Sequence, residues 1–158
     1  IQAVQLLQPG SAQGLVAFDG KRLLMNSAMT KVYAAADPDR IIIYDGRVGA
    51  ALGLLTRYTL MRASLPSVPA DLSFRWGAGQ GDTTNRDPSL GAFKFRKLNA
   101  AQCQLWAGQV LLAGELLQQV MAYNPSIGSI AELEKALFMI GYNVDPELPP
   151  LPLPRVSP

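Results

Sequence analysis

The feature that most constrains the fold is a long apolar stretch, residues 100–123, in which Glu115 is the only charged residue. Large apolar side chains recur along it at helical spacing: Leu105, Trp106, Leu112, Leu116, Val120 and Met121. A helix so poor in charge is stable only when other parts of the chain cover most of its surface. We therefore expect a central buried helix, and we expect Cys103, Met121 and Met139 to belong to the core.

Further helices are expected on both sides of this central one. Apolar spacing predicts them over residues 1–8, 21–36 and 45–64, and Ser129 with Glu132 forms a capping box that begins another. The β-branched run at 41–44 has no partner run, so a buried extended segment is predicted there. The fold is thus predicted to be mainly α. One compact helical domain with long loops covers residues 1–144, and an extended proline-rich tail covers 145–158.

Composition bears on two expectations, the cellular location of the protein and whether it binds nucleic acid or membranes. Charged residues make up 16% of the 158 positions, and the net charge of +2 is too small to indicate nucleic-acid binding by itself. No apolar run is long enough to span a bilayer and no stretch has a signal-peptide pattern. We expect a cytoplasmic protein with no membrane partner. The chain begins at Ile1 rather than methionine, so whether an N-terminal segment precedes it stays an open question.

The chain contains no histidine. This excludes a Ser-His-Asp triad, a Cys-His dyad and a zinc ion held by histidine. The glycine-rich loops that bind nucleotide phosphates are also absent from the sequence, so we expect no cofactor and no metal site. Any catalysis would have to use lysine, aspartate, glutamate, tyrosine or arginine.

A lysine and an aspartate flank the turn that begins at Asp37-Pro38. Lys31 lies in Thr-Lys-Val, and Asp45 lies in Tyr-Asp-Gly-Arg-Val at the start of the next predicted helix. This order of a helix, Thr-Lys-Val, an apolar turn and hydrophobic-x-Asp-x-x-Val resembles the active-site segment of the helix-hairpin-helix DNA glycosylases. The 8-oxoguanine branch of that family is the most similar. The resemblance covers about residues 25–55, and the glycines of the family's hairpin are absent from residues 25–29.

The resemblance implies a DNA glycosylase and lyase that acts through a lysine Schiff base. Lys31 would be the nucleophile, and its amine would have to be unprotonated, which burial or a neighbouring positive charge favours. Asp45 would be the catalytic carboxylate, and the dipole of the helix that it opens would favour its charged form. A base must leave the DNA stack to be reached, so a pocket with aromatic side chains is also expected. Tyr33, Phe74 and Trp76 are the candidates for that pocket.

Basic residues concentrate in the glycine-rich region between residues 71 and 98. Together with Arg47 they form the predicted nucleic-acid-binding set: Arg47, Arg75, Trp76, Arg86, Lys94, Arg96 and Lys97. Arginine and lysine suit contacts to phosphate, and tryptophan suits stacking on a base.

Each of these features has a simpler interpretation. Lys31 can be a solvated residue of an amphipathic helix, and Asp45 an ordinary helix cap. The basic loop can be pinned by a buried Trp76, with Arg86 and Asp87 as a local ion pair. Two other functions therefore stay open: a non-catalytic domain that binds nucleic acid or a nucleotide, and a homodimeric interaction module.

Overall fold

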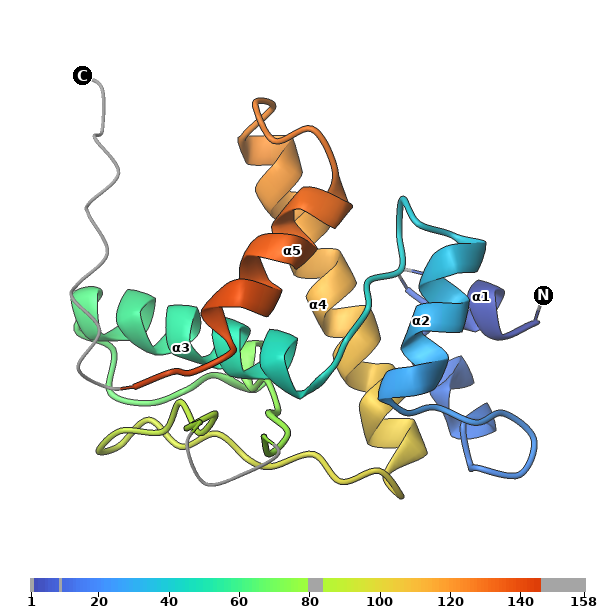
Figure 1. Cartoon of the computed structure of the whole chain (residues 1–158), viewed down its shortest axis with the longest axis horizontal. Coiled ribbons are helices and arrows are strands. Elements are labelled where there is room, and N and C mark those ends of the chain that lie inside the picture. Colours follow the sequence, from blue (N-terminus) through green and yellow to red (C-terminus); the bar gives the residue numbers. More distant parts are fainter. Residues whose placement is uncertain (1, 9, 80–83, 146–158) are drawn as a thin grey trace.

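The computed structural model describes residues 2–8, 10–79 and 84–145. Within these ranges the chain forms five α-helices and two short 3₁₀ helices, and no β-strand (Figure 1). This confirms the mainly α prediction. The predicted extended tail lies outside the described residues except for Asp145. None of the described helices combines the length and the apolarity that a membrane span requires.

The longest helix, α4 (Cys103–Tyr123), runs through the middle of the molecule as predicted (Figure 1). Its buried face packs on the 3₁₀ helix η1 (Ala12–Ala17) and on α5 (Ile130–Ile140). The helix begins three residues later than predicted, because residues 99–102 form a turn in which Gln102 Oε1 accepts from Asn99 N (3.0 Å). Cys103 is buried as expected. The prediction of Met139 as a core residue was wrong, since its side chain on α5 is 76% exposed.

Helix α3 (Gly46–Arg62) packs against α5 and begins where the sequence predicted. Asp45 is its N-cap, with Oδ1 accepting from Arg47 N (2.8 Å) and Val48 N (3.0 Å). Ser129 caps α5 in the same way by accepting from Glu132 N (3.3 Å). Both caps satisfy amides that the first turn of a helix leaves unpaired, so these two helix starts are encoded locally.

The N-terminal helices α1 (Gln2–Leu6) and α2 (Ser27–Ala36) pack together beside η1. The prediction of one helix over 21–36 was wrong for its first six residues. Asp19 Oδ1 accepts from the amides of Lys21 and Arg22, which holds that segment in a turn. Helix α2 then starts at Ser27, and its N-cap is Asn26, whose side chain accepts from Ala28 N and Met29 N.

The buried segment at 41–44 joins α2 to α3 without entering a sheet, as predicted. Its polar backbone groups are paired mainly with side chains: Ile43 N donates to Glu134 Oε2 (2.7 Å), and Trp106 Nε1 donates to Tyr44 O (3.0 Å). Thr30, buried on α2, also contacts Tyr44 O through its hydroxyl (3.3 Å). Helices α2, α4 and α5 thereby fix the path that leads into Asp45.

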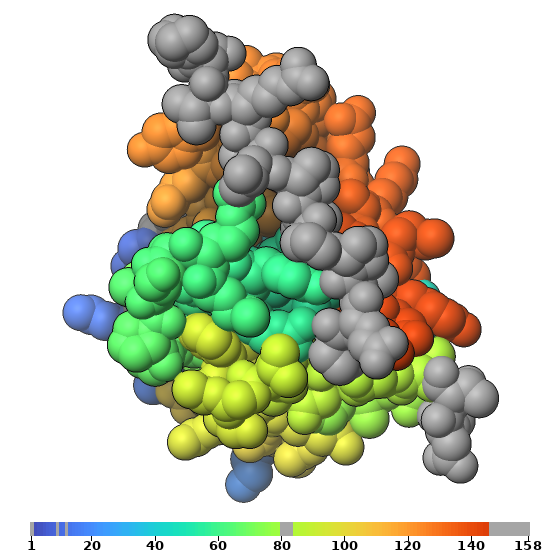
Figure 2. Space-filling model, turned by 90° about the vertical axis from the view of Figure 1, so that its left-hand side faces the viewer, coloured from blue at the N-terminus to red at the C-terminus, as the bar shows by residue number. Residues whose placement is uncertain are grey.

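A long loop between α3 and α4 covers the flank of α3, where Figure 2 shows its residues 84–100 in yellow-green beside the green helix. Residues 76 and 97 form a parallel bridge, and residues 90 and 93 an antiparallel one. The loop is also tied to the core, because Arg75 N donates to Gln109 Oε1 (2.6 Å) on α4 and the Tyr44 hydroxyl donates to Arg75 O (2.7 Å). The loop therefore has a defined position over the first turns of α3.

Candidate functional site

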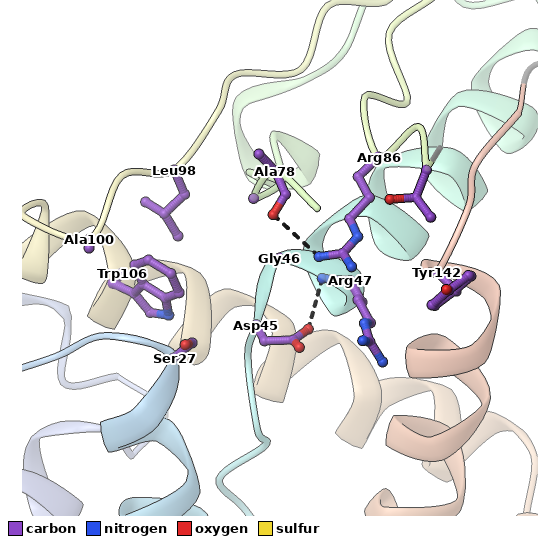
Figure 3. A pocket seen from close by; sticks show the side chains of 12 residues that line it. Ser27, Asp45, Gly46, Arg47, Ala78, Arg86, Leu98, Ala100, Trp106 and Tyr142 are labelled. Carbon is purple, nitrogen blue, oxygen red and sulfur yellow. Dashed lines mark hydrogen bonds between the residues drawn. The ribbon is translucent and has the colours of Figure 1, made fainter. Parts of the chain in front are cut away.

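A cavity of about 520 Å³ lies at the first turn of α3 (Figure 3). Its walls come from α2, α3, the start of α4, the end of α5 and the long loop. One end is apolar, with Leu98, Ala100 and Trp106, and the other end holds Arg47, Arg86 and Tyr142. Asp45 and Gly46 lie between the two ends (Figure 3). The volume is within the range of about 300–1,000 Å³ that small-molecule sites occupy.

Asp45 presents one carboxylate oxygen to the helix, and the other has no donor within the described part of the protein. Oδ1 accepts the two amides of the first turn of α3, whereas no residue in the described ranges donates a hydrogen bond to Oδ2. The carboxylate is half-buried and lies on the cavity wall. It can therefore accept a hydrogen bond from a ligand, or interact with positive charge on one, without giving up its role as a cap.

Two arginines, Arg47 and Arg86, line the other end of the cavity, and neither has a carboxylate partner among the described residues. The Arg47 guanidinium lies over the rings of Phe138 (4.3 Å to the centroid) and Tyr142 (5.3 Å). Arg86 Nη1 donates to Ala78 O (3.3 Å), while its buried Nε has no partner in residues 2–8, 10–79 and 84–145. The ion pairs formed among the described residues are Arg22–Asp19 and Arg40–Asp37, and include neither arginine.

The surroundings of Arg86 disfavour its positive charge. Burial lowers the pKa of Arg86 from its ordinary value, and the nearby charge of Arg47 lowers it further, while Asp45 acts in the opposite direction. An anion bound between the two guanidinium groups would relieve both effects, because it would pair with the charges and supply hydrogen-bond acceptors. This end of the cavity is therefore suited to a phosphate or a carboxylate.

Close backbone approaches hold the walls together. A Cβ on Gly46 would lie 2.7 Å from Gly77 Cα, and a Cβ on Gly141 would overlap the carbonyl oxygen of Arg47. A Cβ on Gly49 would likewise overlap the carbonyl oxygen of Arg75. Glycine at these positions lets the loop and the end of α5 meet the first turn of α3 backbone to backbone.

The structure brings Asp45 but not Lys31 into this cavity. Lys31 is exposed on α2, whose first residue, Ser27, contributes to the cavity wall. The buried side chains of Thr30 and Tyr33 fix how α2 faces the core, and this leaves Lys31 at the surface. Its interpretation as a solvated helix residue accounts for that position.

The predicted nucleic-acid-binding residues divide into two groups. Arg47 and Arg86 line the cavity. Lys94, Arg96 and Lys97 are exposed on the loop, and Arg75 is half-buried with Nη1 3.5 Å from Lys97 O. The alternative ion pair between Arg86 and Asp87 does not form, because Asp87 Oδ1 accepts from Ser89 N instead (2.9 Å).

The aromatic residues expected around a base lie elsewhere. Trp76 packs beside Ala50 and Leu54 and donates from Nε1 to Phe95 O (3.2 Å), with Lys97 Nζ 5.9 Å from its ring centroid. Phe74 and Tyr33 are buried core residues. The aromatic residues of the cavity are instead Trp106 and Tyr142.

Sequence reasoning assigned Trp106 to the apolar face of the central helix and gave no role to Tyr142. Trp106 does belong to the core, since it is only 6% exposed, but the wall it forms depends on a loop that is distant in sequence. Tyr142 follows Gly141 directly, and the only local signal for it was this small residue at the end of a helix. The sequence pattern therefore did not predict that Trp106 or Tyr142 lines the cavity.

The cavity has no evident metal site. Within the described part of the chain, no three histidine, cysteine, aspartate or glutamate side chains gather in a metal-binding arrangement. The available chemistry is one carboxylate, two guanidinium groups and hydroxyl groups of Ser27, Thr84 and Tyr142. Such a set binds and orients an anionic ligand, and its carboxylate can stabilise positive charge that develops on the ligand.

No protein-family model matches the chain, and no match was found among curated proteins or among solved structures. The resemblance to the helix-hairpin-helix DNA glycosylases therefore rests on the sequence pattern of residues 25–55.

Proposed function

We propose that the cavity beside Asp45 binds a phosphate-bearing ligand with a planar ring, as a nucleotide or a nucleotide unit of nucleic acid has. The observation that carries this proposal is the polarity of the cavity. Arg47 and Arg86 form one end, with no carboxylate paired to either within the described part of the chain, and Trp106 and Leu98 form the other. Phosphate would bind between the guanidinium groups, and the ring would lie against the apolar wall.

The proposal makes Asp45 a selective element of the site. A carboxylate near the phosphate end would repel a ligand with negative charge along its whole length. The Asp45 carboxylate would favour a ligand whose middle part offers hydroxyl or amino donors, because Oδ2 can accept hydrogen bonds from these groups. A sugar hydroxyl or an exocyclic amino group meets that requirement.

Calorimetric titration with adenosine monophosphate, adenosine, ribose 5-phosphate and inorganic phosphate tests this function. A short single-stranded DNA oligonucleotide, titrated at several salt concentrations, separates a free nucleotide from a strand. We expect adenosine monophosphate to bind more tightly than adenosine or phosphate alone. If neither the nucleotide nor the oligonucleotide binds at millimolar concentration, the proposed function is wrong.

A matched pair of arginine variants links binding to the cavity. Arg86→Met should weaken nucleotide binding by about 10- to 100-fold, the range for loss of a charge-assisted hydrogen bond. Arg62→Met is the control, because Arg62 is exposed in the last turn of α3, at the opposite end from the cavity. Equal affinities of the two variants would argue against this site.

The position of Asp45 favours a second candidate, cleavage of an N-glycosidic bond. In this reaction water would attack C1′ of the sugar and release one proton to solvent, and the bond from C1′ to the base nitrogen would break with its electron pair moving to the base. A proton from solvent would then neutralise the departing base. Asp45 would stabilise the positive charge that develops on the sugar.

Two experiments test this second candidate. Asp45→Asn retains the cap, because asparagine accepts the same amides, and should abolish base release from a nucleotide or from damaged DNA. Borohydride trapping with abasic DNA tests the lysine Schiff base separately, with Lys31→Gln as the variant. Base release without trapping would support an Asp45-dependent hydrolase, and absence of both reactions would reject the glycosylase proposal.

A further inference from the structure

The buried arginine of α3, Arg57, is the most unusual charged group outside the cavity. Its residue is only 1% exposed, yet no carboxylate lies within ion-pair distance of it among the described residues. Its Nε has no hydrogen-bond partner in the part of the chain that the structure describes, and its guanidinium carbon lies 5.4 Å from the centroid of the Tyr58 ring. Burial of an unpaired cation is unfavourable, so its retention requires a specific role.

Arg57 makes one short hydrogen bond to the loop. Its Nη1 donates to Pro88 O at 2.6 Å, and Pro88 is itself fully buried against the same face of α3. A Cβ on Gly53, one turn earlier on that face, would lie 2.6 Å from Pro88 Cγ. The helix therefore holds Pro88 by a polar contact from Arg57 and by close packing at Gly53.

Pro88 is two residues from Arg86, and short-range hydrogen bonds from backbone amides to side chains link the residues around them. Asp87 N donates to Asn85 Oδ1 (2.9 Å), and Ser89 N donates to Asp87 Oδ1 (2.9 Å). The other end of this segment is fixed by Val144 N, which donates to Asn85 O (2.7 Å). A displacement of Pro88 would thus be transmitted to Arg86 through a short segment with little freedom.

We infer that Arg57 is a positioning residue that sets the place of Arg86 in the cavity by holding the carbonyl group of Pro88. The guanidinium group suits this task because its planar donors have a fixed geometry, whereas a lysine ammonium is a flexible point donor. The inference rests on the proposed function for its consequence in ligand binding. Its structural content, the dependence of Arg86 on Arg57, does not require a ligand.

A double-mutant cycle tests the inference through binding of adenosine monophosphate. Arg57→Met should weaken binding by about tenfold in the wild-type background. It should have no further effect once Arg86→Met is present, because Arg57 acts only through Arg86. Arg57→Lys, which retains a buried donor for Pro88 O, should recover part of the loss. Wild-type affinity of a folded Arg57→Met protein, or an equal loss in both backgrounds, would overturn the inference.

A second measurement keeps the test independent of the ligand. The side-chain Nε signal of Arg86 in a ¹⁵N NMR spectrum, assigned by its loss in Arg86→Met, should shift or broaden in Arg57→Met. An unchanged signal in the folded variant would overturn the inference even if the wild-type protein binds no nucleotide. If Arg57→Met does not fold, Arg57→Lys replaces it in both measurements, with a smaller shift expected and an unchanged signal again decisive.

Discussion

Two of the cavities are similar in size and opposite in chemistry, and α3 contributes residues to both. The cavity beside Asp45 has arginines, a carboxylate and backbone walls. The other, of about 450 Å³, lies between α3, α4 and α5, and leucine, valine, isoleucine, alanine and threonine side chains line it. Leu117 and Leu137 are buried members of this apolar cavity, and Thr56 is its least exposed polar member.

The difference indicates what each space contributes. Apolar side chains on three helices meet imperfectly between them, and the resulting space belongs to core packing. The cavity beside Asp45 forms where loops and helix ends meet, so its walls include unpaired charges that core packing would not require. Volume alone does not distinguish a binding site from a packing defect, whereas charged groups that line the cavity favour a binding site.

The largest expected effect concerns the apolar cavity. Leu117→Ala should lower the free energy of unfolding by about 3–4 kcal/mol, because it removes buried methyl groups beside existing empty space. Affinity for adenosine monophosphate should stay within about twofold of the wild type, a change of less than 0.5 kcal/mol. Chemical denaturation and calorimetry measure the two quantities. A tenfold loss of nucleotide affinity would show that the cavities are coupled.

A substitution at the polar cavity should rank next. Gly49→Ala should cost about 2–3 kcal/mol of stability, since its Cβ would overlap the carbonyl oxygen of Arg75 and force the loop away from α3. Gly108→Ala on α4 is the matched control, because its Cβ would have its nearest neighbour at 3.8 Å. The control should stabilise the protein by up to about 1 kcal/mol through helix propensity. Equal melting temperatures would contradict this account of the close approach.

Substitutions of Asp45 separate its role as a cap from its charge. Asp45→Ala should lose about 1 kcal/mol of stability, whereas Asp45→Asn should be close to the wild type because asparagine caps equally well. Both variants lack the carboxylate, so they should change nucleotide affinity to a similar extent. Thermal unfolding and titration of the two proteins together check this. A stability loss of the same size in Asp45→Asn would mean that the charge itself stabilises the fold.

The smallest effect depends on pH and concerns Glu134 on α5. Burial raises the pKa of Glu134 above its ordinary value of 4.5, while the hydrogen bond from Ile43 N partly opposes that shift. The folded state therefore favours the protonated form, so this contribution to stability is complete below pH 4.5 and is lost as pH rises through the folded pKa.

Glu134→Gln keeps an acceptor for Ile43 N without a charge that burial disfavours. The variant should match the wild type near pH 4 and melt about 1–2 °C higher at pH 7. Thermal unfolding at the two pH values measures this difference. A variant that is less stable than the wild type at pH 7 would mean that the charged hydrogen bond outweighs the burial penalty.

The parts of the fold that depend on residues close together in the sequence could be predicted. The caps at Asp45 and Ser129 and the apolar spacing after them located α3 and α5. The buried segment at 41–44 was also predicted correctly. The predicted start of the helix at residue 21 was wrong because the side chain of Asp19 pairs with the next amides and competes with helix formation.

The cavity could be predicted only in part. Asp45, Arg47 and Arg86 were among the candidate residues, but Lys31 was expected to lie with Asp45 and instead lies at the surface. Trp106 and Tyr142 enter the cavity because α4, α5 and the loop meet there. Such contacts join residues far apart in the chain, and helical periodicity carries no information about them.

The glycines at the first turn of α3 have a consequence for how a ligand would enter. Gly46, Gly49 and Gly141 let main-chain atoms touch, and main-chain contacts leave no rotamers to rearrange. The backbone that carries the arginine and tyrosine side chains is therefore fixed in advance, and little backbone entropy is lost on association. Selection among competing molecules would then depend on how well each fits this fixed backbone.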